Sequence, residues 1–338
     1  MTFPETSRFQ LADDLAIRRV LNGMWQVSGG HGAIDPARAI DQMFAYHDAG
    51  FTTWDLADHY GPAEDFIGEF RRRFATQRGP ERLPEIQAFT KWVPHPGPVS
   101  RRLVEDAIDV SRARMGVASL DLLQFHWWDY RDRRYLDALE HLADLRREGK
   151  IRRLALTNFD TERLRVIVDH GVPIVSNQVQ YSLIDRRPEA RMAAFCGDHA
   201  LSLLAYGTLL GGLLSEKYLG RSEPRRDELA TASLQKYKQM IDAWGGWALF
   251  QELLAALGHI AGQHDVGIAN VGVRYVLDRP AVAGVIIGAR LGVVQHLIDN
   301  ARTFAFTLDA DDLARIEGVL AKSRDLMQLI GDCGDEYR

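Results

Sequence analysis

Eight short apolar runs recur along this chain, and longer stretches with helical periodicity separate them. A short apolar run that lies between helical stretches is typical of a buried strand in a parallel sheet. Neighbouring parallel strands joined through helices require right-handed crossovers. The expected strands cover residues 20–25, 52–56, 86–92, 120–125, 153–157, 174–179, 203–206 and 284–287.

The stretches between these runs carry the signals of helix ends. Asp35 stands at an expected N-cap with Pro36 at the first helical position, and Ser100 and Asp160 stand at two later N-caps. Glycines follow four of the expected helices, at Gly50, Gly116, Gly149 and Gly171. Regular alternation of strands and capped helices predicts an α/β protein.

Eight strand-and-helix units favour a closed (β/α)8 TIM barrel, expected as a single domain over residues 1–338. The alternative, a doubly wound open sheet, normally has a GxGxxG loop after its first strand, and this sequence lacks that spacing there. The longest stretch without clear periodicity, about 211–247, is expected to form a long loop. Together with the C-terminal tail it should lie at the active-site end of the barrel.

Composition excludes several classes of function. The 41 Lys and Arg residues against 46 Asp and Glu residues give a formal charge of −5, which attracts neither nucleic acid nor anionic membranes. Two cysteines make a disulfide framework improbable, and no apolar run is long enough for a membrane span. Without a signal-peptide pattern, a cytoplasmic location is expected. Nothing in the sequence indicates the oligomeric state.

Polar residues recur at the ends of successive expected strands. Asp55, Lys91, His126 and Thr157 are each about one strand-and-helix unit apart, and Tyr60 follows Asp55 in the next loop. Because the C-terminal ends of barrel strands share one face, these side chains should converge. Taken singly, Asp55 could precede a helix, Lys91 could be a solvated charge, and His126 could be a core histidine. Four such groups on one face indicate a catalytic site.

These groups suit proton donation by a phenol. A tyrosine is a weak acid at neutral pH, but a nearby ammonium stabilises its phenolate and lowers its pKa. Asp55 would keep Lys91 charged, and His126 could hydrogen-bond the phenol or a substrate oxygen. Such a group can protonate an oxygen that gains negative charge, as in carbonyl reduction by hydride. The step requires neither a metal ion nor a covalent nucleophile.

The chain resembles the aldo-keto reductase family from about residue 20 to 300. The motifs that match, in order, are WDLADHYGPAEDFIG, AFTKW, LLQFHWW, GKIRRLALTNF, SNQVQYSLIDRRPE, AYGTLLGGLL and VAGVIIGAR followed by QHLIDN. The resemblance implies an NAD(P)H-dependent reductase of aldehydes or ketones. It also implies a catalytic tetrad of Asp55, Tyr60, Lys91 and His126, with Tyr60 as the general acid.

The resemblance further implies which residues bind the nicotinamide. Thr157, Asn158 and Gln178 would hydrogen-bond its carboxamide, and Tyr206 would stack on its ring. After Tyr206 this chain has Gly-Thr where relatives often have Ser-Pro. The loop that approaches the diphosphate retains its apolar and flexible character at Leu209 and Gly211.

The last strand and its following helix resemble the family's adenosine-phosphate site. Arg290 occupies the basic position that meets a 2′-phosphate, and His296 replaces a second basic residue. Asp299 and Asn300 match the acidic and amide pair near adenine, whereas Leu291 replaces a hydroxyl group. NADP(H) is therefore the preferred cofactor, and NAD(H) remains possible.

The expected substrate is a small carbonyl compound held by aromatic walls. Trp25, Trp127 and Trp128 are the candidate pocket residues. Three alternatives stay open: an NADPH-binding regulatory subunit with weak or no turnover, a metal-dependent barrel hydrolase, and a Schiff-base enzyme that uses Lys91. No metal site is expected, because no HxH motif follows the first strand and the 11 histidines are scattered.

Overall fold

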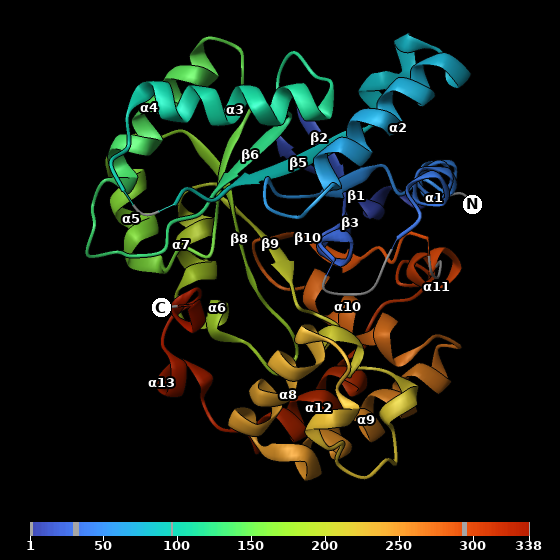
Figure 1. Ribbon diagram of the computed structural model, residues 1–338. Helices are drawn as coiled ribbons and strands as arrows, with labels where there is room; N and C mark the ends of the chain where they lie inside the picture. The colour runs from blue at the N-terminus through green and yellow to red at the C-terminus, as the bar shows by residue number, and fades with distance from the viewer. Residues whose placement is uncertain (1–2, 30–33, 96, 293–295, 338) are drawn as a thin grey trace.

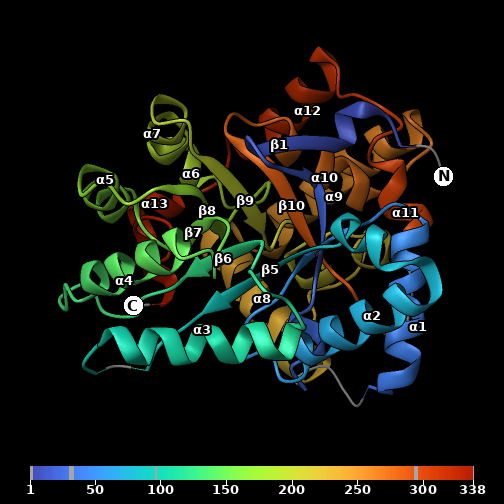
Figure 2. The same cartoon turned by 90° about the horizontal axis from the view of Figure 1, so that it is seen from above.

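Eight parallel strands form a closed barrel in the computed structural model, which describes residues 3–29, 34–95, 97–292 and 296–337. Helices surround the strands (Figure 1), and the view from above shows the same arrangement (Figure 2). In barrel order the strands are β10 (Val282–Gly288), β3 (Val20–Gly23), β4 (Thr53–Asp55), β5 (Gln87–Trp92), β6 (Leu122–Phe125), β7 (Leu154–Thr157), β8 (Ile174–Gln180) and β9 (Ser202–Tyr206). The expected TIM barrel is confirmed, and all eight expected strands are present with shifts of one or two residues at their ends.

The predicted helix starts are confirmed by their hydrogen bonds. The side chains of Asp35, Ser100 and Asp160 accept backbone N–H groups at the first turns of α1 (Pro36–Asp48), α3 (Arg101–Met115) and α5 (Thr161–Asp169). Gly116 ends α3 with a φ of 65°, a conformation that favours glycine. The other helices are α2 (Ala63–Arg78), α4 (Tyr135–Arg147), α6 (Arg187–Ala190), α7 (Met192–Asp198), α8 (Ala232–Trp244), α9 (Gly246–Gln263), α10 (Ile268–Leu277), α11 (Leu297–Arg302), α12 (Ala310–Leu320) and α13 (Leu326–Ile330).

A two-stranded hairpin, not expected from the sequence, covers the N-terminal end of the barrel. β1 (Arg8–Ala12) pairs antiparallel with β2 (Leu15–Arg18). Its buried Leu15 and Ile17 pack with Phe89 and other apolar side chains of the barrel strands. Asp14 in the hairpin turn forms an ion pair with Arg153, just before β7. These contacts close the end of the barrel opposite the strand C-termini.

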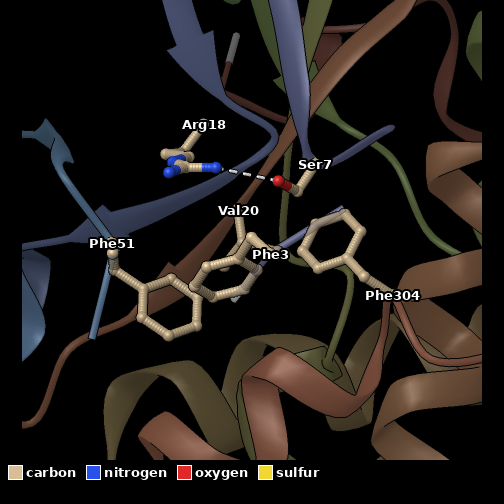
Figure 3. A pocket seen from close by; sticks show the side chains of 7 residues that line it. Phe3, Ser7, Arg18, Val20, Phe51 and Phe304 are labelled. Atoms are coloured by element: carbon tan, nitrogen blue, oxygen red, sulfur yellow. Dashed lines mark hydrogen bonds between the residues drawn. The ribbon is translucent and has the colours of Figure 1, made fainter. Parts of the chain in front are cut away.

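Aromatic packing seals the neighbouring edge of the same end. The Phe3 ring lies edge-on against Phe51 and Phe304 (Figure 3). Its centroid is 5.0 Å from that of Phe51 and 5.9 Å from that of Phe304. In the same view Arg18 Nη1 donates a hydrogen bond to Ser7 Oγ at 2.9 Å. The small cavity between these side chains has no room for a water molecule. Any open site on the barrel must therefore lie elsewhere.

The segment 211–247 is more ordered than the sequence indicated. It contains α8 and the short 3-10 helices Glu216–Tyr218 and Arg226–Glu228, so the expectation of an irregular loop throughout was wrong. α8 lies against the turn that follows β9: at Gly207, whose φ is +74°, a Cβ atom would lie only 2.3 Å from Tyr237 Oη. The segment therefore covers the C-terminal end of β9, as expected.

None of the helices in the described ranges combines the length and the apolar character that a membrane-spanning helix needs.

Candidate active site

The polar strand-end residues predicted from the sequence converge at the C-terminal face of the barrel. Asp55 is the last residue of β4, Lys91 lies near the end of β5, and His126 directly follows β6. Lys91 Nζ donates to Asp55 Oδ2 at 2.6 Å and to the Leu56 carbonyl at 2.8 Å. Both side chains of this ion pair are only 4% exposed. The predicted Asp55–Lys91 pair is therefore present and buried.

Burial and ion pairing act on Lys91 in opposite directions. Burial lowers the pKa of the Lys91 ammonium, and the carboxylate of Asp55 opposes that decrease. Lys91 Nζ also lies 5.1 Å from the centroid of the Tyr60 ring. A positive charge at this place favours the phenolate form of a tyrosine over the phenol.

Tyr60 lies in the loop between β4 and α2, among aromatic neighbours. Its half-buried ring packs edge-on against Trp25 and His59, with centroids 5.0 and 4.9 Å away. His59 Nδ1 lies 2.7 Å from Asp58 Oδ1. Asp58 Oδ2 in turn accepts the backbone N–H of Val93, just beyond β5. The loop is thereby tied to the strand that carries Lys91.

His126 is buried beside the same site. Its Nδ1 lies 3.2 Å from the Thr157 carbonyl oxygen, which can only accept a hydrogen bond, so Nδ1 carries the hydrogen. The Trp128 ring lies edge-on to the imidazole, with centroids 4.4 Å apart. These contacts fix the ring's orientation at the strand end.

Two buried amides contact Asp55, and one of them, Gln124, was not expected from the sequence. Asp55 Oδ1 accepts from Gln124 Nε2 at 2.8 Å and from Gln178 Nε2 at 2.7 Å. Gln178 Nε2 also donates to Gln124 Oε1 at 2.7 Å. Gln124 lies on β6 two residues before His126, so strand alternation places both on one face. The sequence signal that could have indicated Gln124 is a glutamine inside the apolar run LLQF.

The expected nicotinamide residues Asn158 and Tyr206 contact each other. Tyr206 ends β9, and its hydroxyl donates to Asn158 Oδ1 at 2.9 Å. Asn158 directly follows β7 with a φ of 58°, which asparagine tolerates better than most residues. Lys236 Nζ of α8 lies 5.5 Å from the Tyr206 ring centroid. Leu209 and Gly211 lie in the next turn, where Gly211 has a φ of 67°.

Only two of the three candidate pocket tryptophans are exposed. Trp25 is 41% and Trp128 is 44% exposed, whereas Trp127 is 4% exposed. The Trp127 indole donates to the carbonyls of Asp129 and Asp132 at 2.8 and 2.9 Å, so it holds the loop after β6 together. Trp127 is therefore buried within this loop, and its place in a substrate pocket stays a prediction.

An open recess of about 580 Å³ lies at the loop after β6, and its wall residue Trp128 packs against the His126 ring. Its walls come from the loop after β6 and from α5, and they comprise Trp128, Asp129, Tyr130, Arg131 and Arg163. The Tyr130 hydroxyl donates to the Asn158 carbonyl at 3.0 Å, which connects this wall to the end of β7.

The residues expected at the adenosine phosphates lie on the connection from β10 to α11. Arg290 is exposed just after β10, whereas Leu291 is buried. His296 Nδ1 lies 3.8 Å from Asp299 Oδ2 at the start of α11, and both side chains are exposed. Asn300 follows on the same helix. Residues 293–295 of this connection lie outside the described ranges.

Within the described part of the chain, no three or more His, Cys, Asp or Glu side chains cluster closely enough to hold a metal ion. The arrangement that the structure does show is a phenol and an imidazole beside a buried ammonium–carboxylate pair. Such groups can move a proton to or from a substrate oxygen.

The chain is similar in sequence and in fold to several known proteins. The flagellar radial spoke protein 5 of Chlamydomonas reinhardtii is 29% identical over 66% of this chain, and the match spans only 49% of that protein. The aldo-keto reductase YhdN of Bacillus subtilis is 24% identical, with 89% of each chain covered. Among solved structures, an aldo/keto reductase from Klebsiella pneumoniae in complex with NADP and acetate superimposes with a TM-score of 0.69. It is 23% identical and covers 93% of this chain and 95% of its own.

The sequence model of the aldo/keto reductase family matches residues 19–321, which is most of the chain. That range contains the whole barrel, from β3 to β10. The chain therefore belongs to the aldo/keto reductase family of oxidoreductases.

Proposed function

We propose that this protein reduces aldehydes or ketones to alcohols with NADPH, and that Tyr60 is the general acid. One observation supports this proposal above all others. The buried Lys91–Asp55 pair places an ammonium 5.1 Å from the Tyr60 ring centroid. A phenol beside a fixed positive charge is adapted to release its proton.

The amides at the strand ends fit a nicotinamide. Gln178 already donates its Nε2 hydrogens to Asp55 and Gln124, so its Oε1 is the atom that would accept a ligand N–H. Asn158 accepts from Tyr206 through Oδ1, so its Nδ2 would donate. One donor and one acceptor are what a primary carboxamide requires. Thr157, Asn158 and Gln178 would hold the carboxamide, and Tyr206 would contact the ring.

A reduced nicotinamide held by these residues would supply the hydride that a carbonyl carbon needs for its reduction. Tyr60 gives its phenolic proton to the carbonyl oxygen as that oxygen gains negative charge. Lys91 stabilises the resulting phenolate, and Asp55 keeps Lys91 protonated and in place. His126 hydrogen-bonds the substrate oxygen and orients the carbonyl group.

Cofactor and substrate preferences follow from the same surroundings. Exposed Arg290 would meet the 2′-phosphate, so NADPH is preferred and NADH is the weaker alternative. The Klebsiella relative was solved with NADP. Trp25 and Trp128 would flank a flat or apolar carbonyl compound. The unpaired buried thiols Cys196 and Cys333 fit a reducing compartment, so we place the protein in the cytoplasm.

The proposal is tested by following NADPH and NADH oxidation against a panel of carbonyl compounds that includes 4-nitrobenzaldehyde. The wild-type protein should oxidise NADPH in step with aldehyde reduction. Tyr60→Phe should abolish turnover and leave NADPH affinity, measured by fluorescence, unchanged. Turnover of Tyr60→Phe at the wild-type rate would exclude Tyr60 as the general acid.

A second function, an NADPH-binding regulatory subunit with weak or no turnover, has one supporting observation. A relative at 29% identity is a flagellar radial spoke protein. The intact Asp55–Lys91 pair beside Tyr60 favours turnover instead. Tight NADPH binding without reduction of any carbonyl in the panel would favour the regulatory function.

A further inference from the structure

The loop that carries Tyr60 has few backbone hydrogen bonds of its own. The Tyr60 N–H donates to the Ala57 carbonyl at 3.2 Å, and the Ala63 N–H donates to the Tyr60 carbonyl at 3.1 Å. The loop leaves β4 at Asp55 and enters α2 at Ala63. The Asp58 N–H also donates to the Lys91 carbonyl at 3.0 Å, which ties the start of the loop to β5. The segment that follows, around Tyr60, needs further contacts to keep a catalytic phenol in one place.

Arg114, near the end of α3, supplies contacts on both sides of Tyr60. Its Nη1 donates to the Asp58 carbonyl at 3.1 Å, and its Nη2 donates to the Gly61 carbonyl at 2.7 Å. Tyr60 lies between these two carbonyls in the sequence. A planar guanidinium can hold two acceptors in a fixed relative position, which a lysine ammonium cannot do.

The same guanidinium connects the loop to the strand of Lys91. Arg114 Nη1 donates to Glu64 Oε2 at 2.9 Å, and Nη2 lies 2.8 Å from Asp65 Oδ2. Glu64 is fully buried, and its Oε1 accepts from Thr90 Oγ1 at 2.6 Å. Thr90 directly precedes Lys91 on β5. The network therefore joins the two elements that carry Tyr60 and Lys91.

Helix packing at this point is unusually close. At Gly68 of α2, a Cβ atom would lie only 2.1 Å from the Arg114 carbonyl oxygen. Any larger residue would separate α2 from α3 and withdraw the guanidinium from the loop. Burial raises the pKa of the Glu64 carboxyl, and hydrogen bonds from Thr90 and Ser111 and the charge of Arg114 oppose that increase. Removing the guanidinium would therefore weaken the ionised state of a buried carboxyl group.

We propose that Arg114 is a positioning residue that holds the Tyr60 phenol at its working distance from Lys91. This inference rests on the proposed function, because it assigns Arg114 a part in the proton transfer by Tyr60. Arg114 itself is hydrogen-bonded to loop carbonyls and carboxylates of the protein, and it acts only through Tyr60.

The kinetic test compares Arg114→Met with Arg114→Lys and with a control variant, Arg112→Met. Arg112 lies on the same helix, but its contacts are with Asp109 and the Ala118 carbonyl, away from the Tyr60 loop. Arg114→Met should lower kcat by about 10²-fold, because a small displacement of a catalytic group has that effect. NADPH affinity should not change, and Arg112→Met should behave like the wild type.

Recovery of activity distinguishes a positioning role of Arg114 from a general loss of protein stability. Arg114→Lys should recover part of kcat, and free guanidinium ion should raise the turnover of Arg114→Gly whereas urea should not. If Arg114→Met folds and retains the wild-type kcat, the proposal is wrong. It is equally wrong if Arg112→Met and Arg114→Met lose activity to the same extent.

A readout without turnover keeps this test distinct from the test of the function. ¹³C-labelled tyrosine NMR, with the Tyr60 signal assigned through Tyr60→Phe, reports the titration of Tyr60 in the wild type and in Arg114→Met. A wild-type protein that reduces no carbonyl compound would overturn the proposed function alone. An unchanged Tyr60 titration in Arg114→Met would overturn the positioning role alone.

Discussion

Glu336 in the C-terminal tail forms an ion pair with Arg187 at the start of α6, with 2.9 Å between Nη1 and Oε2. The Arg187 guanidinium is completely buried and is also bound by both carboxylate oxygens of Asp185, each at 2.8 Å. Glu336 Oε1 lies 3.4 Å from the Tyr206 hydroxyl. The tail therefore contacts the tyrosine that we assign to the nicotinamide.

We predict that Glu336→Gln releases the tail and weakens NADPH binding more than it lowers kcat. The variant replaces the charge-assisted hydrogen bond between Arg187 and Glu336 by a weaker bond to a neutral amide. Hydrogen exchange of residues 331–337 and NADPH titration would measure the two effects. Glu228→Gln, an exposed site, is the control. Unchanged exchange in the tail would contradict the prediction.

The stability that the Arg187–Glu336 ion pair contributes should fall in acid. Burial acts to raise the pKa of Glu336, but the charge and hydrogen bond of Arg187, together with the Lys236 charge and a backbone hydrogen bond, hold the pKa below its usual value. A lowered carboxyl pKa contributes stability above the pKa of an unfolded glutamate, and this stability is lost as the pH falls through the folded value. The protection factors of the tail amides, which correct for the slower intrinsic exchange in acid, should thus fall on acidification in the wild type and depend less on pH in Glu336→Gln.

The long-range contacts of the tail show where sequence reasoning ends. Arg187 and Glu336 are 149 positions apart, and no periodicity connects them. The strand ends were predictable, because a parallel barrel repeats one unit and brings equivalent positions to one face. That repeat was enough to predict Asp55, Lys91 and His126 as neighbours, and the structure confirms the Asp55–Lys91 pair.

Other elements were missed for identifiable physical reasons. Gln124 looked like part of an apolar strand, because its partners Asp55 and Gln178 lie on other strands. Arg114 looked like an ordinary helix charge, since its acceptors belong to a loop about 50 residues earlier. α8 was not predicted, because it follows a Gly-, Arg- and Lys-rich segment and the whole stretch lacks clear helical periodicity. Interactions between distant residues decided the cases of Gln124 and Arg114.

We predict that loss of the Lys91 proton at alkaline pH has opposite effects on activity and stability. It should lower kcat, while the contribution of Lys91 to the unfolding free energy rises. Burial lowers the pKa of Lys91, so its native ammonium loses the proton at a lower pH than an unfolded lysine does. Between the two pKa values the unfolded chain binds more protons, so this group makes the unfolding free energy rise with pH. kcat should fall over the same interval, because Tyr60 loses its positive neighbour.

The substitution Asp55→Asn tests the role of the Lys91 charge by removing its partner carboxylate. Loss of the carboxylate leaves a buried ammonium without its counter-charge, which should cost about 3–5 kcal/mol of unfolding free energy. The alkaline limb of kcat should also move to lower pH. Urea denaturation and pH–rate profiles measure these effects, with Asp35→Asn at the exposed start of α1 as a control. An unmoved alkaline limb would mean that Lys91 does not control it.

We predict that Gln124→Leu impairs the site although Gln124 reaches no proposed ligand. The substitution removes one donor from Asp55 and the acceptor of Gln178. The loss of buried hydrogen bonds should lower the unfolding free energy by about 1–3 kcal/mol. NADPH affinity should fall, because Gln178 is no longer held. Gln10→Leu, at an exposed hairpin position, serves as the control for both measurements.

We predict that Arg290→Ala separates the two nicotinamide cofactors. Arg290 is exposed just after β10, where it can reach a phosphate group without a large desolvation cost. A charge-assisted hydrogen bond of this kind contributes about 1.5–3 kcal/mol, so the NADPH dissociation constant should rise by roughly 10- to 150-fold. NADH has no 2′-phosphate, and its dissociation constant should stay the same. Arg302→Ala, later on α11, should affect neither cofactor, because its guanidinium contacts Asp265. Equal losses for NADPH and NADH in Arg290→Ala would place the 2′-phosphate elsewhere on the barrel.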